Sequence, residues 1–94
     1  MPIKYIRNWE LKSFDDIVDV RSPDEYQEDH IPNSTNLPVL YNLERKEIGT
    51  IYKNKSAFTA KKIGASLVSA NIAAHIKKKL LTKPGNWKVL IYCW

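Results

Sequence analysis

The sequence has one cysteine, Cys93, and three glycines among its 94 residues. A single cysteine excludes an internal disulfide and a zinc site made from several cysteines, and it is typical of a reducing compartment. The glycines are scattered and form no phosphate-binding loop. Because the two histidines, His30 and His75, lie far from Cys93 and from each other in the sequence, we expect no metal site.

Long apolar runs are absent as well. No stretch approaches the roughly 18 consecutive apolar residues that cross a membrane. Lys4, Arg7 and Glu10 interrupt the N-terminal region, where a signal peptide would be apolar. We therefore expect a cytoplasmic protein without a membrane partner. The length allows one small domain, residues 1–94, which buries too little surface to have a wide stability margin.

Acidic residues are missing from the second half of the chain. Every aspartate and glutamate lies before Ile48, whereas the residues that follow include nine basic ones (Lys53, Lys55, Lys61, Lys62, Lys77, Lys78, Lys79, Lys83 and Lys88). This asymmetry favours a polyanionic partner, and nucleic acid is the usual one. Tyr52 and Phe58 lie among these lysines, as in surfaces that hold a nucleic-acid backbone and stack its bases. The alternative is a solvated, lysine-rich helix face with both aromatic residues in the core.

Strands alternate with helices along the sequence. Apolar and β-branched residues predict buried strands over 16–20 and 89–92, and a very short strand around 35–37. An apolar stripe at three- and four-residue steps predicts a long helix that begins after Ser56 (Ile63, Leu67, Val68, Ile72, Ile76 and Leu80). This alternation indicates an α/β fold in which helices flank a parallel sheet.

The starts and ends of the helices are also indicated. Residues 22–25 (Ser-Pro-Asp-Glu) have the spacing of a capping box with proline at the first helical position. Pro32 requires that helix to end shortly before it. Asn42 is predicted to cap a second helix, and residues 49–53 either continue that helix or kink it.

Arg21 and Cys93 directly follow two of the predicted strands. Ligands bind at the carboxyl ends of parallel strands, so these two residues should share one rim. A thiol there can be surrounded by backbone N–H groups that lower its pKa, and a buried structural cysteine is the alternative. Arg21 is a candidate for binding an anionic substrate or for fixing a loop, and Asp19 is expected to cap backbone N–H groups. His30 is expected to bond local backbone, and His75 to lie at the core edge.

Two motifs carry a resemblance to a known fold family. Residues 16–26 (Asp-Ile-Val-Asp-Val-Arg-Ser-Pro-Asp-Glu-Tyr) resemble the opening signature of rhodanese-like domains. Residues 30–38 (His-Ile-Pro-Asn-Ser-Thr-Asn-Leu-Pro) resemble its usual continuation, with Asn33 in place of a glycine. Asparagine tolerates a positive φ angle, so we expect the turn to be retained.

The middle and the end of the chain narrow the resemblance. Residues 49–53 (Gly-Thr-Ile-Tyr-Lys), 56–58, 62–68 and 71–73, together with the ending Tyr92-Cys93-Trp94, resemble the tRNA 2-selenouridine synthase family. Ordinary single-domain rhodaneses lack the Gly-Thr-x-Tyr-Lys stretch and the long helix after it. The resemblance therefore covers nearly the whole chain.

The resemblance implies a rhodanese-like α/β fold with Cys93 as the catalytic nucleophile. It implies an enzyme that replaces the sulfur of wobble 2-thiouridine in tRNA by selenium. The selenium would come from selenophosphate, through a geranylated intermediate made from geranyl diphosphate, and no bound cofactor is implied. The Cys93 thiolate is expected to attack selenophosphate and carry a perselenide, with Arg21, Lys53, Lys61 and Lys62 as substrate-binding residues.

The resemblance also implies that residues 1–94 are an incomplete, N-terminal part of a longer protein. The family's active-site loop, closing helix and C-terminal phosphate-binding-loop domain would follow the strand that bears the cysteine. The chain alone would then be inactive and marginally stable, with apolar surface of its last strand exposed. Two other hypotheses stay open: a rhodanese-type sulfurtransferase that carries sulfane sulfur to a small acceptor, and a catalytically inactive binding module.

Overall fold

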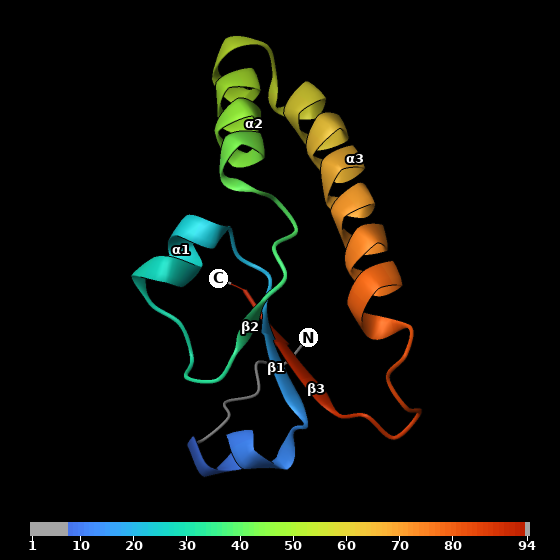
Figure 1. The fold of residues 1–94 in the computed structure, drawn as a ribbon. Coiled ribbons are helices and arrows are strands. Elements are labelled where there is room, and N and C mark those ends of the chain that lie inside the picture. The colour runs from blue at the N-terminus through green and yellow to red at the C-terminus, as the bar shows by residue number, and fades with distance from the viewer. Residues whose placement is uncertain (1–7, 94) are drawn as a thin grey trace.

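A three-stranded parallel sheet lies at the centre of the computed structural model, which describes residues 8–93 (Figure 1). Lys4, Arg7 and Trp94, which the sequence arguments used, lie outside the described residues. The strand order is β2-β1-β3, with both neighbours parallel to β1. The elements follow in the order η1 (Asn8–Ser13), β1 (Asp16–Asp19), α1 (Pro23–Glu28), β2 (Thr35–Asn36), α2 (Asn42–Asn54), α3 (Ala57–His75), the π-helical turn η2 (Ile76–Leu80) and β3 (Val89–Tyr92). The predicted parallel α/β fold is confirmed.

The three strands end in register. Asp19, the last residue of β1, lies opposite Asn36 in β2 and Tyr92 in β3. The backbone N–H of Leu37 donates to the Asp19 carbonyl at 2.9 Å, and the N–H of Val20 donates to the Tyr92 carbonyl at 3.1 Å. The chain segments that follow the strands therefore leave the sheet at one edge.

The short helix α1 begins with the predicted capping box. Both the backbone N–H and the hydroxyl of Ser22 donate to the Glu25 carboxylate, at 3.3 and 2.8 Å. Pro23 occupies the first helical position, where its missing N–H has no helical partner to lose. After α1 the chain turns at Asn33, which has a φ of 67°. The expectation that asparagine supports this turn is confirmed.

Helix α2 corrects one prediction and resolves an ambiguity. Its N-cap is Tyr41 rather than Asn42, because the Tyr41 N–H is satisfied by the Glu44 carboxylate at 2.9 Å. Asn42 is already helical, and its side-chain oxygen instead accepts the backbone N–H of Asp24 at 3.1 Å. Residues 49–53 continue the helix without a kink.

Helix α3 begins after Ser56, as predicted, with the Thr59 N–H donating to the Ser56 hydroxyl at 3.0 Å. It packs against α2 and ends in the turn η2. Asn71 ties the two helices together, since its side-chain amide donates to Glu44 and to the Val39 carbonyl, both at 2.8 Å. No helix in residues 8–93 is long and apolar enough to cross a bilayer.

The hydrophobic core is small. Among the described residues, Val18 and Ala60 are the hydrophobic side chains that count as buried. The apolar stripe of α3 is only partly covered, and Ile72 is 41% exposed. Ile91 in the edge strand β3 is 58% exposed, which agrees with the expected exposure of apolar surface on the last strand.

We predict that replacing Asn33 by alanine destabilises the fold. A residue with a Cβ atom costs roughly 1–2 kcal/mol of conformational energy in the left-handed region. Asparagine incurs less of this cost than alanine, because its short polar side chain can hydrogen-bond locally. Asn33→Ala should therefore lower the free energy of unfolding by roughly 1 kcal/mol, whereas Asn33→Gly should not lower it. Denaturant titration measures both. The exposed turn residue Asn86 is the control, and an equal loss in Asn86→Ala would contradict the argument.

Candidate active site

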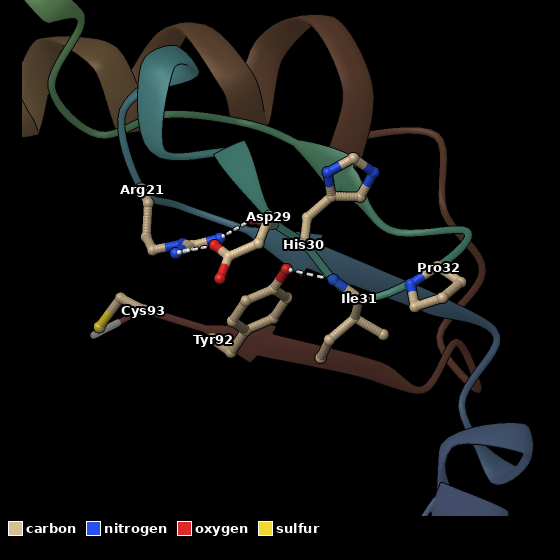
Figure 2. A pocket seen from close by; sticks show the side chains of 7 residues that line it. All are labelled: Arg21, Asp29, His30, Ile31, Pro32, Tyr92 and Cys93. Carbon is tan, nitrogen blue, oxygen red and sulfur yellow. Dashed lines mark hydrogen bonds and ion pairs between the residues drawn. The ribbon is translucent and has the colours of Figure 1, made fainter. Parts of the chain in front are cut away.

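Arg21 and Cys93 lie together at the carboxyl edge of the sheet. They border a cavity of about 450 Å³ that is completed by the loop after α1 (lining residues Arg21, Asp29, His30, Ile31, Pro32, Tyr92 and Cys93). Figure 2 shows Arg21 and Cys93 on the same side of this cavity, with Asp29 and Ile31 of the loop beside Tyr92. The predicted common rim is thus present in the structure.

The carboxylate of Asp19 organises this edge. Asp19 is fully buried, at 0% exposure, and accepts the backbone N–H of Arg21 at 2.8 Å. The Arg21 guanidinium adds hydrogen bonds from Nη2 at 2.9 Å and from Nε at 3.1 Å. Burial alone would raise the pKa of Asp19, but the hydrogen bonds and charge of Arg21, with a contribution from Tyr92, hold this pKa below its ordinary value. The expected capping role of Asp19 is therefore seen, joined to an ion pair.

Arg21 also reaches across to the loop after α1. Its Nη1 atom lies 3.3 Å from the Asp29 carboxylate, and its Nη2 atom donates to the Asp29 carbonyl. Hydrogen bonds to Asp19, and then the charges of both carboxylates, raise the pKa of Arg21, so it stays cationic. The guanidinium thus fixes this loop to the strand end, which is one of the two roles proposed from the sequence. Binding of an anionic substrate by Arg21 stays a prediction.

Tyr92 is a site residue that the sequence arguments missed. Its hydroxyl accepts the backbone N–H of Ile31 at 3.1 Å, and it also hydrogen-bonds to the Asp19 carboxylate. The Arg21 guanidinium carbon lies 5.8 Å from the centre of the Tyr92 ring, within reach of a cation–π contact. Tyr92 thereby connects the strand that precedes the cysteine to the loop that walls the cavity. The only sequence signal was its place directly before Cys93.

Cys93 is the first residue after β3, and its side chain is exposed. Besides the main cavity, it borders a second cavity of about 230 Å³, together with Arg21 and residues of α1 and α2. Arg45 of α2 lines this second cavity and forms an ion pair with Glu25. Two arginines from distant parts of the chain therefore lie near the thiol, and sequence spacing alone could not bring Arg45 to it.

The two histidines are engaged by the backbone. The Nδ1 atom of His30 lies 2.6 Å from the Tyr26 carbonyl, and its ring stacks on that of Tyr26 at 3.8 Å. In Figure 2 the His30 imidazole lies on the opposite side of the cavity from Cys93. The Nε2 atom of His75 lies 2.7 Å from the Pro38 carbonyl, at the half-buried edge of α3. Within residues 8–93, no group of three or more potential ligands is placed to hold a metal ion.

The three candidate lysines are not part of this cavity. Lys53 lies at the end of α2, and Lys61 and Lys62 lie in the first turns of α3. All three are exposed. The junction of α2 and α3 is the part of the helical hairpin farthest from the sheet (Figure 1). The structure therefore separates these lysines from Arg21 and Cys93, and their role in substrate binding stays a prediction.

A parallel sheet whose carboxyl edge presents an Asp-x-Arg segment beside a cysteine is the arrangement expected from the resemblance to rhodanese-like domains. The sequence matches the rhodanese-like domain family over residues 5–94, and the chain belongs to that family.

Within this class, the chain is similar to proteins named tRNA 2-selenouridine synthase. It is 33% identical over 78 residues to the synthase of Psychromonas ingrahamii, which covers 83% of this chain and 21% of the relative. It is 40% identical over 73 residues to that of Bdellovibrio bacteriovorus, covering 73% and 19%. It is 45% identical over 56 residues to that of Shewanella sediminis, covering 60% and 15%. The chain thus spans about a fifth of the length of the curated relatives it matches.

A solved structure shares the fold. The N-terminal domain of a putative ATP/GTP binding protein from Clostridium difficile 630 superposes with a TM-score of 0.65 and is 34% identical in sequence. The superposition covers 96% of this chain and 71% of that one.

We predict that Tyr92→Phe destabilises the cavity wall. The change leaves the ring in place but removes the acceptor of the Ile31 N–H and a partner of Asp19. Loss of a partner for the half-buried Ile31 N–H and the buried Asp19 carboxylate should lower the free energy of unfolding by about 1–3 kcal/mol. The rate at which iodoacetamide alkylates Cys93 should also change, because the loop after α1 that walls its cavity loosens. Tyr52→Phe, at a 60% exposed position, is the control and should leave both measurements unchanged.

A second prediction concerns pH. The pKa of Asp19 is lower in the folded chain than its ordinary value of 3.8. Its contribution to stability is therefore fully present above that value and is lost as the pH falls through it toward the lower folded pKa. Asp19→Asn should lower the urea midpoint at about pH 7, and it should make the further decrease toward about pH 3 smaller than in the parent chain. Asp24→Asn, at an exposed carboxylate, is the control. An unchanged pH dependence in Asp19→Asn would contradict the argument.

Proposed function

We propose that this chain is the cysteine-bearing domain of a cytoplasmic enzyme that replaces the sulfur of wobble 2-thiouridine in tRNA by selenium. The observation that carries the proposal is the position of Cys93. It lies exposed at the carboxyl edge of a parallel sheet, beside Arg21, in a chain similar to tRNA 2-selenouridine synthases. An exposed thiol at a cavity mouth is placed for reaction, unlike a buried structural cysteine.

The proposed net exchange is balanced without an external oxidant. Geranyl diphosphate alkylates the sulfur of 2-thiouridine, and diphosphate leaves. A C2–Se bond then forms with selenium from selenophosphate, while the C2–S bond breaks and geranyl thiol leaves. In this direct route, without a selenium-carrying cysteine, water takes up the phosphorus group as phosphate. Selenium enters at the same oxidation level at which sulfur departs.

Cys93 is proposed as the nucleophile that takes up selenium from selenophosphate. Its thiolate attacks selenium, so that an S–Se bond forms and the Se–P bond breaks, and phosphorus leaves with the electron pair as phosphite. In this covalent variant, selenium on Cys93 must regain two electrons before transfer to the uridine. A thiol reductant supplies them by cleaving the S–Se bond and becoming a disulfide.

Arg21 is proposed to attract the anionic oxygens of selenophosphate. Its guanidinium borders both cavities that Cys93 lines, although Asp19 and Asp29 compensate much of its charge. Lysines of the basic second half, Lys53, Lys61 and Lys62 among them, are proposed to contact the tRNA. Complete turnover is proposed to need the longer protein, because the chain spans about a fifth of its relatives.

The proposal predicts selenium uptake at one residue. The chain is incubated anaerobically with selenophosphate and then analysed by intact mass spectrometry and phosphorus NMR. We expect one selenium atom per chain and phosphite as the product, and no uptake by Cys93→Ser. The same chain should not complete the exchange on tRNA by itself.

Three outcomes decide this test. Selenium uptake by the Cys93→Ser chain would overturn the role of the cysteine. Phosphate in place of phosphite would overturn the covalent variant of the step. Equal uptake of sulfur from thiosulfate would instead favour a rhodanese-type sulfur carrier.

A further inference from the structure

We propose that the tip of the α2–α3 hairpin is a docking surface for unpaired RNA, and that it holds the substrate at a distance from Cys93. The hairpin tip is defined here as six residues on both sides of the helix junction (Tyr52, Lys53, Lys55, Phe58, Lys61 and Lys62). This inference rests on the proposed function for the identity of the RNA. Binding at the tip, however, can be measured without any reaction at Cys93.

The aromatic residues of the hairpin tip face solvent. Phe58 is 70% exposed and Tyr52 is 60% exposed. The alternative considered from the sequence, with both rings in the core, does not hold in this structure. The ammonium group of Lys62 lies 5.0 Å from the centre of the Phe58 ring, within cation–π range. A flat ring beside a cation is the arrangement on which a nucleic-acid base stacks while its phosphate meets the positive charge.

No ion pair among the described residues compensates the charge of the hairpin tip. Its four lysines are all exposed. The four ion pairs within residues 8–93 are made by Arg21, Arg45 and Lys83, and none of these residues belongs to the tip. Helix α2 has two acidic residues: Glu44 is occupied at the other end of the helix by Tyr41 and Asn71, and the exposed Glu47 takes part in none of these ion pairs. A polyanion therefore meets positive charge here without displacing an internal partner.

The separation between the hairpin tip and Cys93 determines how large a ligand must be to contact both. Helix α2 begins beyond the carboxyl edge of the sheet, after an extended segment, and carries the hairpin tip still farther from it (Figure 1). Its 13 residues correspond to about 20 Å at a rise of about 1.5 Å per residue. Selenophosphate cannot contact the tip and Cys93 at once, whereas an RNA loop can extend over both. The tip therefore suits the macromolecular substrate and leaves the cavity to the small one.

Exposed ring faces favour unpaired over duplex RNA. In a duplex both faces of each base are covered by its neighbours, so that only phosphates remain for the lysines. In a single-stranded loop, bases are available to stack on Phe58 and Tyr52. An acidic protein would use the lysines and gain little from the rings, and the experiment below tests this occupant.

The test is the affinity of the chain for a fluorescein-labelled single-stranded RNA, measured by anisotropy at several salt concentrations. Phe58→Ala should weaken binding about tenfold, which is within the range known for loss of one stacked base. The triple variant K53Q/K61Q/K62Q should weaken binding and reduce the slope of log K against log salt by about 2 for single strands. Cys93→Ser should bind as the parent chain does, so a failed Cys93 reaction and a failed docking surface are told apart.

Matched variants elsewhere on the chain provide the controls. Leu81→Ala removes an apolar side chain with the same 70% exposure as Phe58 and should not affect binding. K77Q/K78Q/K79Q makes the same charge change at the other end of the helical segment and should have the smaller effect. Circular dichroism verifies that each variant is folded.

Several results would overturn the proposal. An equal loss in the two triple variants would show diffuse electrostatic attraction instead of a docking surface. Equal affinity for duplex and single-stranded RNA would show that the aromatic rings have no role in binding. Equal affinity for polyglutamate and RNA would indicate an acidic protein as the partner in place of RNA. An unaffected Phe58→Ala chain would also contradict it.

Discussion

Asp19 is a fully buried carboxylate at the end of the central strand, and the geometry of the site follows from the need to satisfy it. A buried charge without partners is very costly, so its hydrogen bonds must be made wherever the fold is formed. The backbone N–H and guanidinium of Arg21 supply most of them, and Tyr92 supplies another. Since Arg21 also holds Asp29, one carboxylate indirectly sets the position of the loop that closes the cavity.

This polar network contributes an unusually large share of the interactions that specify the fold, because the apolar core is small. Val18 and Ala60 are the buried hydrophobic residues of the described chain, and much of the α3 stripe remains partly exposed. Packing alone therefore specifies the relative position of strand ends and loop only weakly. Removing one partner of a buried charged pair typically costs about 3–5 kcal/mol, whereas loss of one surface pair costs at most about 1. The contacts that fix the strand ends and the loop are consequently concentrated at the edge of the sheet where Cys93 emerges.

Much of the fold could be predicted from local sequence signals, whereas contacts between segments distant in sequence could not. Residues 22–25 specify the start of α1 by themselves, and Ser56 specifies the start of α3, because cap and helix are adjacent. The common rim of Arg21 and Cys93 followed from a rule for parallel strands. The bond between Tyr92 and Ile31 joins residues 61 apart in sequence, and that between Arg45 and Glu25 spans 20. Asn42 looked like a cap, but Asp24, distant in sequence, gave its side chain another partner.

The length of the connection between β2 and β3 bears on function. Two parallel strands need a crossover of about a dozen residues, and one helix suffices. Here α2 and α3 contribute 13 and 19 residues, and the apolar side of α3 and η2 remains partly uncovered, with Ile72 of α3 and Ile76 of η2 each 41% exposed. The second helix thus adds little burial to the sheet. The α2–α3 hairpin as a whole does add reach, because α2, about 20 Å long, carries the hairpin tip with its aromatic rings and lysines away from the sheet. Such an extension supports the proposal that the domain holds an RNA beside its cysteine, because small sulfur or selenium donors alone do not require it.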